Sequence, residues 1–266
     1  MKVTKVTQQR RPGRYNIYFD DEFGIAVDEK VLIDFNLFKG TEIDEEQLDE
    51  VKTAEYEQKA YSAGLLYATG QLHSRYQVYL NLRDKDFPQD TINRVLDRLE
   101  AANVINDATF AQTYAQNMAD SGKFGRKGTA EKLKSWGVKA NLVEDALDVY
   151  PYEREVDHLA VEVPKIMAKN QRGSHQMAEQ KVMQKLLQKG FSATNIKRAL
   201  ADYDESIEND QDEEFENLRR DGQKAFERYH QYSGWDQTQR VKSYLARRGY
   251  RFDDINHFVS DYLENN

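Results

Sequence analysis

The sequence predicts a mainly α-helical protein, with tandem three-helix repeats in an elongated, curved array and a small N-terminal antiparallel β-hairpin region. Short apolar bursts give way to helical spacing at residue 44. A block of apolar residues then recurs four times along the chain. The charged fraction of 32% exceeds the roughly 25% of an ordinary domain. A high charged fraction indicates much surface, which several small cores explain better than one thick core.

The β-hairpin region is predicted to span residues 1–43. Apolar and β-branched residues run in short bursts at 14–19, 23–27 and 31–33. The segments between the bursts contain Pro, Gly or clustered charges, which suit turns. We therefore expect a small antiparallel sheet, which Gly40 and Thr41 close.

Helical spacing begins at Asp44, and Asp44 with Gln47 resembles a capping box. The repeat block follows, aligned on Phe87, Val138, Phe191 and Tyr250 at separations of 51, 53 and 59 residues. Nine residues before each anchor stand Val78, Thr129, Val182 and Val241. The other flanking positions lie five residues before, five residues after and nine residues after each anchor. Block by block, in this order, they hold Leu82, Ile92 and Leu96; Leu133, Val143 and Leu147; Leu186, Ile196 and Leu200; Leu245, Ile255 and Val259. Fifteen of these sixteen flanking residues are aliphatic, so we predict that they form the repeat core.

Each block predicts a pair of helices joined by a tight turn. The apolar positions before and after the anchor each share one helical face. Gly137, Gly190 and Gly249 precede three anchors and suit the left-handed residue that ends a helix, and Asp86 takes this place in the first block. The expected N-caps of the following helices are Asp90, Asn141, Asn195 and Asp253 or Asp254.

A third helix is expected between successive pairs, at 106–114, 153–168 and 213–229. The predicted repeats are therefore 44–122 (a helical lead-in with repeat 1), 123–171, 172–233 and a partial fourth repeat at 234–266. Because such a unit cannot bury its apolar face alone, neighbouring units should stack.

Composition excludes several classes of protein. The absence of cysteine removes disulfides, thiol catalysis and thiolate metal sites. No long apolar run or signal-like N-terminus is present, so we expect a cytoplasmic protein that does not enter a membrane. The five histidines, none within ligand spacing of another, are His73, His158, His175, His230 and His257. Residues 125–129 resemble a phosphate-binding loop only superficially, because a predicted helix precedes them. The sequence thus predicts no enzyme, no metal site and no cofactor.

Basic residues recur on the first helix of successive pairs. The candidate contact residues are Arg126, Lys127, Lys132, Lys134, Lys181, Lys185, Lys189, Arg247, Arg248 and Arg251. They fit either a solvated helix face or a surface that contacts phosphates or an acidic partner. The acidic stretch at 202–216 is interpreted as a solvated linker, with phosphate mimicry toward a DNA-binding partner as the alternative.

The repeat block, the segment Asn106-Asp107-x2-Phe110-Ala111 and the segment 123–128 together resemble the RecX family of RecA regulators, in its long, Gram-positive type. The resemblance implies a monomeric, non-enzymatic protein of homologous recombination, DNA repair and the SOS response. Such a protein binds the RecA–DNA filament and restrains RecA recombinase activity. The net charge of −8 favours RecA over direct, weak DNA contact. The alternative is a helical-repeat DNA-binding protein that acts independently of RecA.

Overall fold

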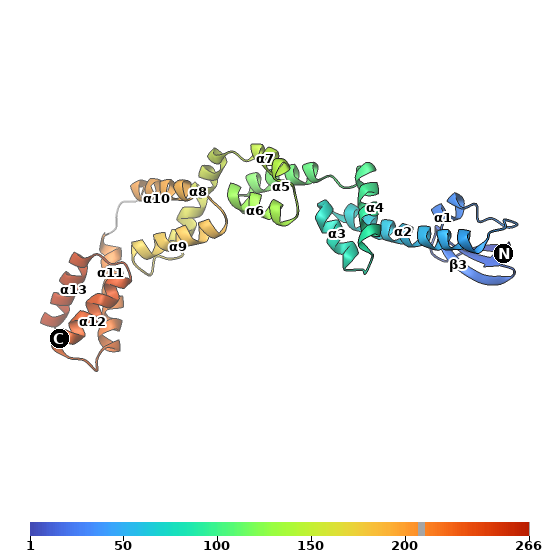
Figure 1. Ribbon diagram of the computed structural model, residues 1–266. Coiled ribbons are helices and arrows are strands. Elements are labelled where there is room, and N and C mark those ends of the chain that lie inside the picture. The colour runs from blue at the N-terminus through green and yellow to red at the C-terminus, as the bar shows by residue number, and fades with distance from the viewer. Residues whose placement is uncertain (207–210, 266) are drawn as a thin grey trace. The chain divides into compact units, whose positions relative to one another are not determined.

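The computed structural model describes residues 1–206 and 211–265. An N-terminal sheet and helix α1 precede a succession of helices (Figure 1). The helices after α1 are α2 (Glu45–Gly70), α3 (Arg75–Arg83), α4 (Gln89–Ala101), α5 (Asp107–Ser121), α6 (Arg126–Ser135), α7 (Ala140–Ala146), a short 3-10 helix (Leu147–Val149), α8 (Tyr152–Ala168), α9 (His175–Gln188), α10 (Ala193–Ser206), α11 (Gln211–Arg228), α12 (Gly234–Arg247) and α13 (Phe252–Glu264). This confirms the mainly helical class. The chain divides into two compact units, residues 1–111 with 133–143 and residues 112–132 with 144–266.

The sheet of the first unit runs antiparallel in the order β1 (Val3–Gln8), β2 (Arg14–Phe19) and β3 (Glu22–Asp28). The predicted bursts at 14–19 and 23–27 are strands, and β1 is an addition that the sequence did not single out. The burst at 31–33 was wrongly assigned to the sheet, because it lies in α1 (Glu29–Asp34). The Asp28 carboxylate accepts the Lys30 amide and starts this helix, which buries Val31 and Leu32.

The first triplet of helices, α2–α4, has its own core beside that of the sheet. The capping box at Asp44 and Gln47 is confirmed, with both of its hydrogen bonds formed. α2 packs against α3 and α4. The core joins residues from all three helices, among them Ala60, Leu82, Ile92, Leu96 and Leu99.

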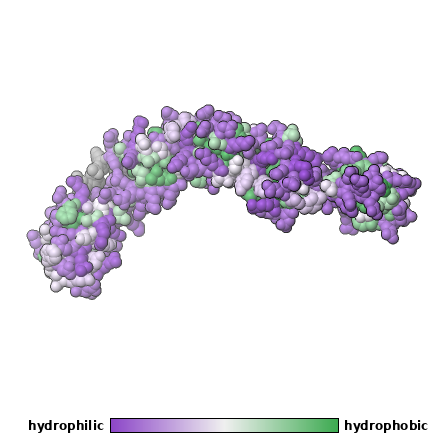
Figure 2. All heavy atoms as spheres, viewed as in Figure 1, coloured by the Kyte–Doolittle hydropathy of each residue, from purple (hydrophilic) through white to green (hydrophobic). Residues whose placement is uncertain are grey.

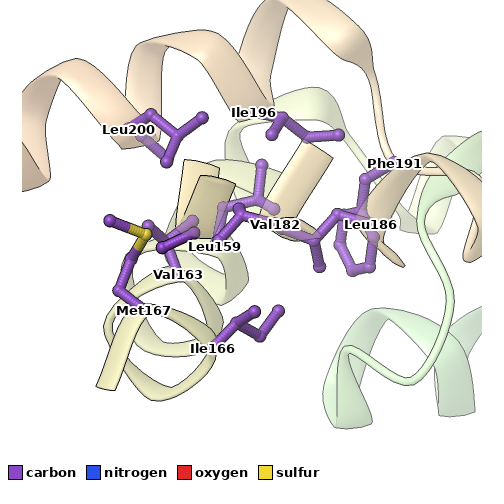
Figure 3. Close-up of a cluster of buried hydrophobic side chains, with 11 residues drawn as sticks. Leu159, Val163, Ile166, Met167, Val182, Leu186, Phe191, Ile196 and Leu200 are labelled. Atoms are coloured by element: carbon purple, nitrogen blue, oxygen red, sulfur yellow. The ribbon is translucent and has the colours of Figure 1, made fainter. Parts of the chain in front are cut away.

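The second unit contains two more packed triplets. α8 packs against α9 and α10, around the cluster shown in Figure 3. Its side chains include Leu159 and Val163 from α8, Leu186 from α9 and Ile196 from α10. α11 likewise packs against α12 and α13 around Leu218, Leu245 and Ile255. We number successive groups of three helices in chain order as modules 1 (α2–α4), 2 (α5–α7), 3 (α8–α10) and 4 (α11–α13); the packing described above concerns modules 1, 3 and 4.

The repeat positions are buried in every module. All sixteen flanking residues are buried, including Thr129. Among the anchors, Val138, Phe191 and Tyr250 are buried, whereas Phe87 is half-buried. The residue before each anchor takes a positive φ: +62° at Asp86, +77° at Gly137, +73° at Gly190 and +83° at Gly249. Asp86 tolerates this conformation because its short polar side chain is among the few that visit it.

The predicted repeat boundaries need correction. The sequence assigned each third helix to the pair before it, whereas α8 and α11 pack on the pairs that follow them. Spacing along the chain could not decide this, because the third helix borders both pairs. Residues 234–266 are therefore not a partial repeat; they supply α12 and α13 to a complete triplet.

The predicted N-caps of α4 and α13 were also wrong by two residues or more. Pro88 caps α4 and Arg251 caps α13, while Asp90 and the Asp253–Asp254 pair lie inside the first turn. Acidic side chains there interact favourably with the helix dipole without bonding the terminal amides.

Among the described residues, none of the helices combines the length and apolarity needed to cross a bilayer.

Candidate functional site

The predicted cationic contacts lie on or beside the middle helices of modules 2, 3 and 4. Hydrophilic side chains dominate the face shown in Figure 2. α9 is the clearest case. Lys181 and Lys185 are exposed one turn apart, while Val182 and Leu186 on the same helix are buried in the module 3 core. Neither lysine has an ion-pair partner among the described residues.

Lys189 differs from the other two lysines because it is engaged within module 3. Its ammonium lies 3.6 Å from Glu162 on α8, and Lys165 lies 3.1 Å from the same carboxylate. Burial alone would raise the pKa of Glu162, but the two lysines outweigh this effect and hold the pKa below its usual value. Lys189 therefore stabilises the contact between α8 and the end of α9.

Arg126 is likewise part of the fold. Its guanidinium donates to the carbonyl oxygens of Leu147 and Tyr150, the latter at 2.6 Å. Its backbone amide donates to Glu155 at 2.8 Å. Beside it on α6, Lys127 is exposed with a loose contact of 3.9 Å to Glu131. Lys132 and Lys134 are exposed as well.

The basic residues near the end of α12 also differ in their surroundings: one has a partner within the fold, and the others are exposed. Arg248 donates to Asp221 of α11 at 2.6 Å, and the Tyr250 hydroxyl donates to the same carboxylate oxygen at 3.0 Å. Burial raises the pKa of Tyr250, and the neighbouring carboxylate adds to the shift. Arg247 and Arg251 are exposed. Of the ten candidate contact residues, Arg126, Lys189 and Arg248 thus have close partners within the fold that hold their charged groups in place.

A feature that sequence reasoning missed is a repeated bond between successive modules. In each case, the N-cap residue of one middle helix donates to the carbonyl just before the left-handed glycine of the next module. The three bonds are Ser74 Oγ to the Trp136 carbonyl (2.7 Å), the Gly125 amide to the Lys189 carbonyl (3.0 Å), and Ser174 Oγ to the Arg248 carbonyl. The carbonyl before the glycine that ends one helix therefore also accepts a hydrogen bond from the preceding module.

A carboxylate accompanies each of these bonds. It comes from the first helix of the next module and accepts the first backbone amide of the middle helix. The pairs are Asp107 with the Arg75 amide (2.7 Å), Glu155 with the Arg126 amide (2.8 Å) and Glu214 with the His175 amide (3.3 Å). An acidic group suits this position because the amino end of a helix carries partial positive charge.

Glu155 is the most buried of these acids, with no solvent exposure. Its second oxygen accepts the Ser192 amide at 3.3 Å and the Asn195 side-chain amide at 2.9 Å. Three donors therefore satisfy one buried carboxylate, and they come from α6 and from the start of α10. Because Glu155 lies on α8 and accepts the Arg126 amide of α6, it links module 3 to module 2 by a hydrogen bond.

The structure also gathers a group of metal-ligand type that the sequence analysis did not anticipate. His175 Nε2 lies 2.9 Å from Asp204 and 3.9 Å from Glu179. The spacing between histidines alone does not reveal this group, because two of its members are acids. The four-residue step from His175 to Glu179 was a readable signal, whereas Asp204 comes from α10 and needed the fold.

Comparison with known proteins gives one consistent result. Family models match at residues 1–44 (Regulatory protein RecX N-terminal domain), 60–99 (RecX, first three-helix domain) and 212–259 (RecX, third three-helix domain). A relative named Regulatory protein RecX from Levilactobacillus brevis is 31% identical over 97% of both chains. One of the same name from Lactobacillus gasseri is 32% identical over 97% of this chain and 94% of its own.

Solved structures agree with these sequence relatives. A crystal structure of regulatory protein RecX matches with a TM-score of 0.65 and 32% identity, over 74% of this chain and 98% of its own. A RecX crystal structure from Lactobacillus salivarius matches with a TM-score of 0.51 and 30% identity, over 57% of this chain and 98% of its own. The match at 212–259 falls on α11–α13, which agrees with the grouping of helices in module 4.

Proposed function

Because the chain belongs to the RecX family of regulatory proteins, we propose that it binds the RecA–DNA filament and inhibits RecA recombinase activity. The observation that carries this proposal is the pair of exposed lysines on α9, Lys181 and Lys185. Among the described residues, neither of them has an ion-pair partner, whereas Lys189 forms an ion pair with Glu162. Unpaired cations on one helical face suit DNA phosphates or an acidic protein surface.

Repetition of the modules supports a binding role of this kind. Exposed cations recur on or beside the middle helices of modules 2, 3 and 4, as Lys127, Lys185 and Arg247 illustrate. Each contact is modest in energy, since exposed ion pairs contribute about 0.2–1 kcal/mol. Linked modest contacts gain overall affinity on a polymeric target through high effective concentration. A filament offers such a target.

The same lysines also support the second candidate, a DNA-binding protein that needs no RecA. Under that function, affinity for naked DNA falls steeply with salt because phosphate contacts release counterions. The net charge of −8 opposes it. A filament partner accommodates an acidic chain more readily, because protein surface contributes to the contact.

The test is charge reversal on α9. The variant Lys181→Glu/Lys185→Glu is compared with Lys197→Glu/Lys224→Glu, which reverses two exposed lysines on α10 and α11 and changes the net charge equally. Co-sedimentation with RecA filaments on single-stranded DNA measures binding, and strand exchange measures inhibition. At about 0.7 kcal/mol per lost contact, binding by the α9 variant should fall about tenfold.

The control variant should bind within about twofold of the parent chain. An equal loss in both variants would show that net charge alone matters and would remove α9 from the interface. Binding to naked DNA, measured over a range of salt, separates the two candidates. Tight, salt-sensitive binding without RecA favours the DNA-binding alternative.

A further inference from the structure

His175, Glu179 and Asp204 form a compact donor group in the second unit. His175 opens α9, Glu179 follows one turn later on the same face, and Asp204 lies in the last turn of α10. One donor atom from each residue lies within 4.8 Å of the other two. The nearest pairs are His175 Nε2 to Asp204 at 2.9 Å and to Glu179 at 3.9 Å.

The group lines a pocket of about 730 Å³ that is rich in acidic side chains. Glu214 and Asp254 contribute further carboxylates, and Arg251 contributes a cation. The pocket therefore holds four carboxylates against one permanently charged cation. This charge balance favours a bound cation.

The distances between the three donor atoms also fit the coordination sphere of a transition-metal ion. Tetrahedral ligands about 2.1 Å from Zn²⁺ stand about 3.4 Å from one another. The observed separations of 2.9 and 3.9 Å lie on either side of that value, so small side-chain movements suffice. A coordination position for water remains when three protein groups bind.

We propose that His175, Glu179 and Asp204 bind a divalent transition-metal ion, with Zn²⁺ as the preferred occupant. An imidazole nitrogen beside carboxylates suits Zn²⁺, while Mg²⁺ and Ca²⁺ prefer oxygen donors. The ion would cross-link the start of α9 to the end of α10. Glu214 extends this brace to module 4, because it accepts the His175 amide at 3.3 Å.

Metal binding changes the bonding within the group. The hydrogen bond between His175 Nε2 and Asp204 is given up, because the ion takes the place of the contact between the two side chains. Burial raises the pKa of Glu179, and the nearby His175 and Asp204 act in opposite directions. The competing structure is a metal-free ion pair that braces α9 against α10.

The experiment is a Zn²⁺ titration of the full chain against a chromophoric chelator. The variants are His175→Ala, Glu179→Gln and Asp204→Asn. His230→Ala is the matched control, because its exposed ring lies outside the donor group and bonds the Glu227 carbonyl. We expect saturable 1:1 binding to the parent chain and to the control. Each ligand variant should bind at least tenfold more weakly, and Mg²⁺ should not compete.

Thermal unfolding supplies a second readout. Zn²⁺ should raise the Tm of the parent chain and of His230→Ala, and should leave His175→Ala unchanged, since an ion bound to the folded state stabilises it by mass action. No saturable binding below about 1 mM, or equal binding by the ligand variants, overturns the site and leaves the ion pair. Neither readout involves RecA, so the site is tested separately from the proposed function.

Discussion

The junction between modules 2 and 3 depends on a glycine that has no room for a side chain. A Cβ on Gly190 would lie 2.1 Å from the backbone nitrogen of Gly128 and 2.3 Å from its Cα. Both neighbours are backbone atoms, which cannot rotate away as a flexible side chain could. Gly190→Ala should therefore separate the start of α6 from the turn between α9 and α10.

The expected cost has two parts. Alanine at the φ of +73° costs about 1–2 kcal/mol by itself. Separation of the modules also breaks two hydrogen bonds, from Gly125 to Lys189 (3.0 Å) and from Gly128 to Gly190 (3.2 Å). Each contributes about 1 kcal/mol. Gly190→Ala should therefore lower the free energy of unfolding by about 3–4 kcal/mol.

Gly13→Ala is the matched control, because Gly13 has nearly the same φ of +74° and no atom within 4 Å of the added Cβ. It should cost only the backbone term of about 1–2 kcal/mol. Urea denaturation followed by circular dichroism gives both values. Hydrogen exchange of the Gly125 and Gly128 amides reports the junction itself, and both amides should exchange faster in Gly190→Ala. Equal losses in the two variants would refute the steric argument.

Two further predictions concern buried polar groups. Glu155→Gln should cost about 2–3 kcal/mol in urea denaturation, because an amide can accept at only one end, and hydrogen bonds to charged groups contribute about 1.5–3 kcal/mol. Glu153→Gln, exposed in the first turn of the same helix, should cost only its interaction with the helix dipole, about 0.3–1 kcal/mol, and equal costs in the two variants would contradict this role of Glu155. Burial raises the pKa of Tyr150 and Tyr250, so above about pH 10 the unfolded chain loses protons that the folded chain keeps. The urea midpoint should hold below that pH and fall above it, and Tyr250→Phe should flatten the fall; a slope unchanged in that variant would contradict the assignment.

The repeat core could be predicted because helix geometry alone governs it. Residues such as Leu82 and Ile92 are buried wherever a helix pair follows this spacing, and the positive φ at Gly137 comes from the same local rule. The assignment of residues 31–33 to the sheet was wrong because the local pattern there is too short to decide. Three apolar residues are too few to separate a strand from one turn of helix. The N-cap at Asp28 decided the outcome.

The surroundings of the candidate contact residues could be predicted only in part. Lys181 and Lys185 share one side of α9 by their four-residue step, and both are exposed, as charged side chains of this length usually are. The structural roles of Arg126 and Arg248 depend on partners 21 to 27 residues away in the chain, which no local pattern reveals. Acids such as Glu155 were equally hidden, because a chain with 46 acidic residues offers no reason to choose one.

The bonds between modules also bear on how the protein meets its partner. In helix-turn-helix proteins, the amino-terminal residues of a recognition helix reach the base edges. In module 3, carboxylates occupy this end of both helices of the pair: Glu214 bonds the start of α9, and Glu155 bonds the start of α10. A carboxylate there takes the amides that a phosphate would need and repels its charge. Insertion of these helix ends into DNA is therefore unfavourable, so the contact proposed above would use the side of α9, where Lys181 and Lys185 lie exposed.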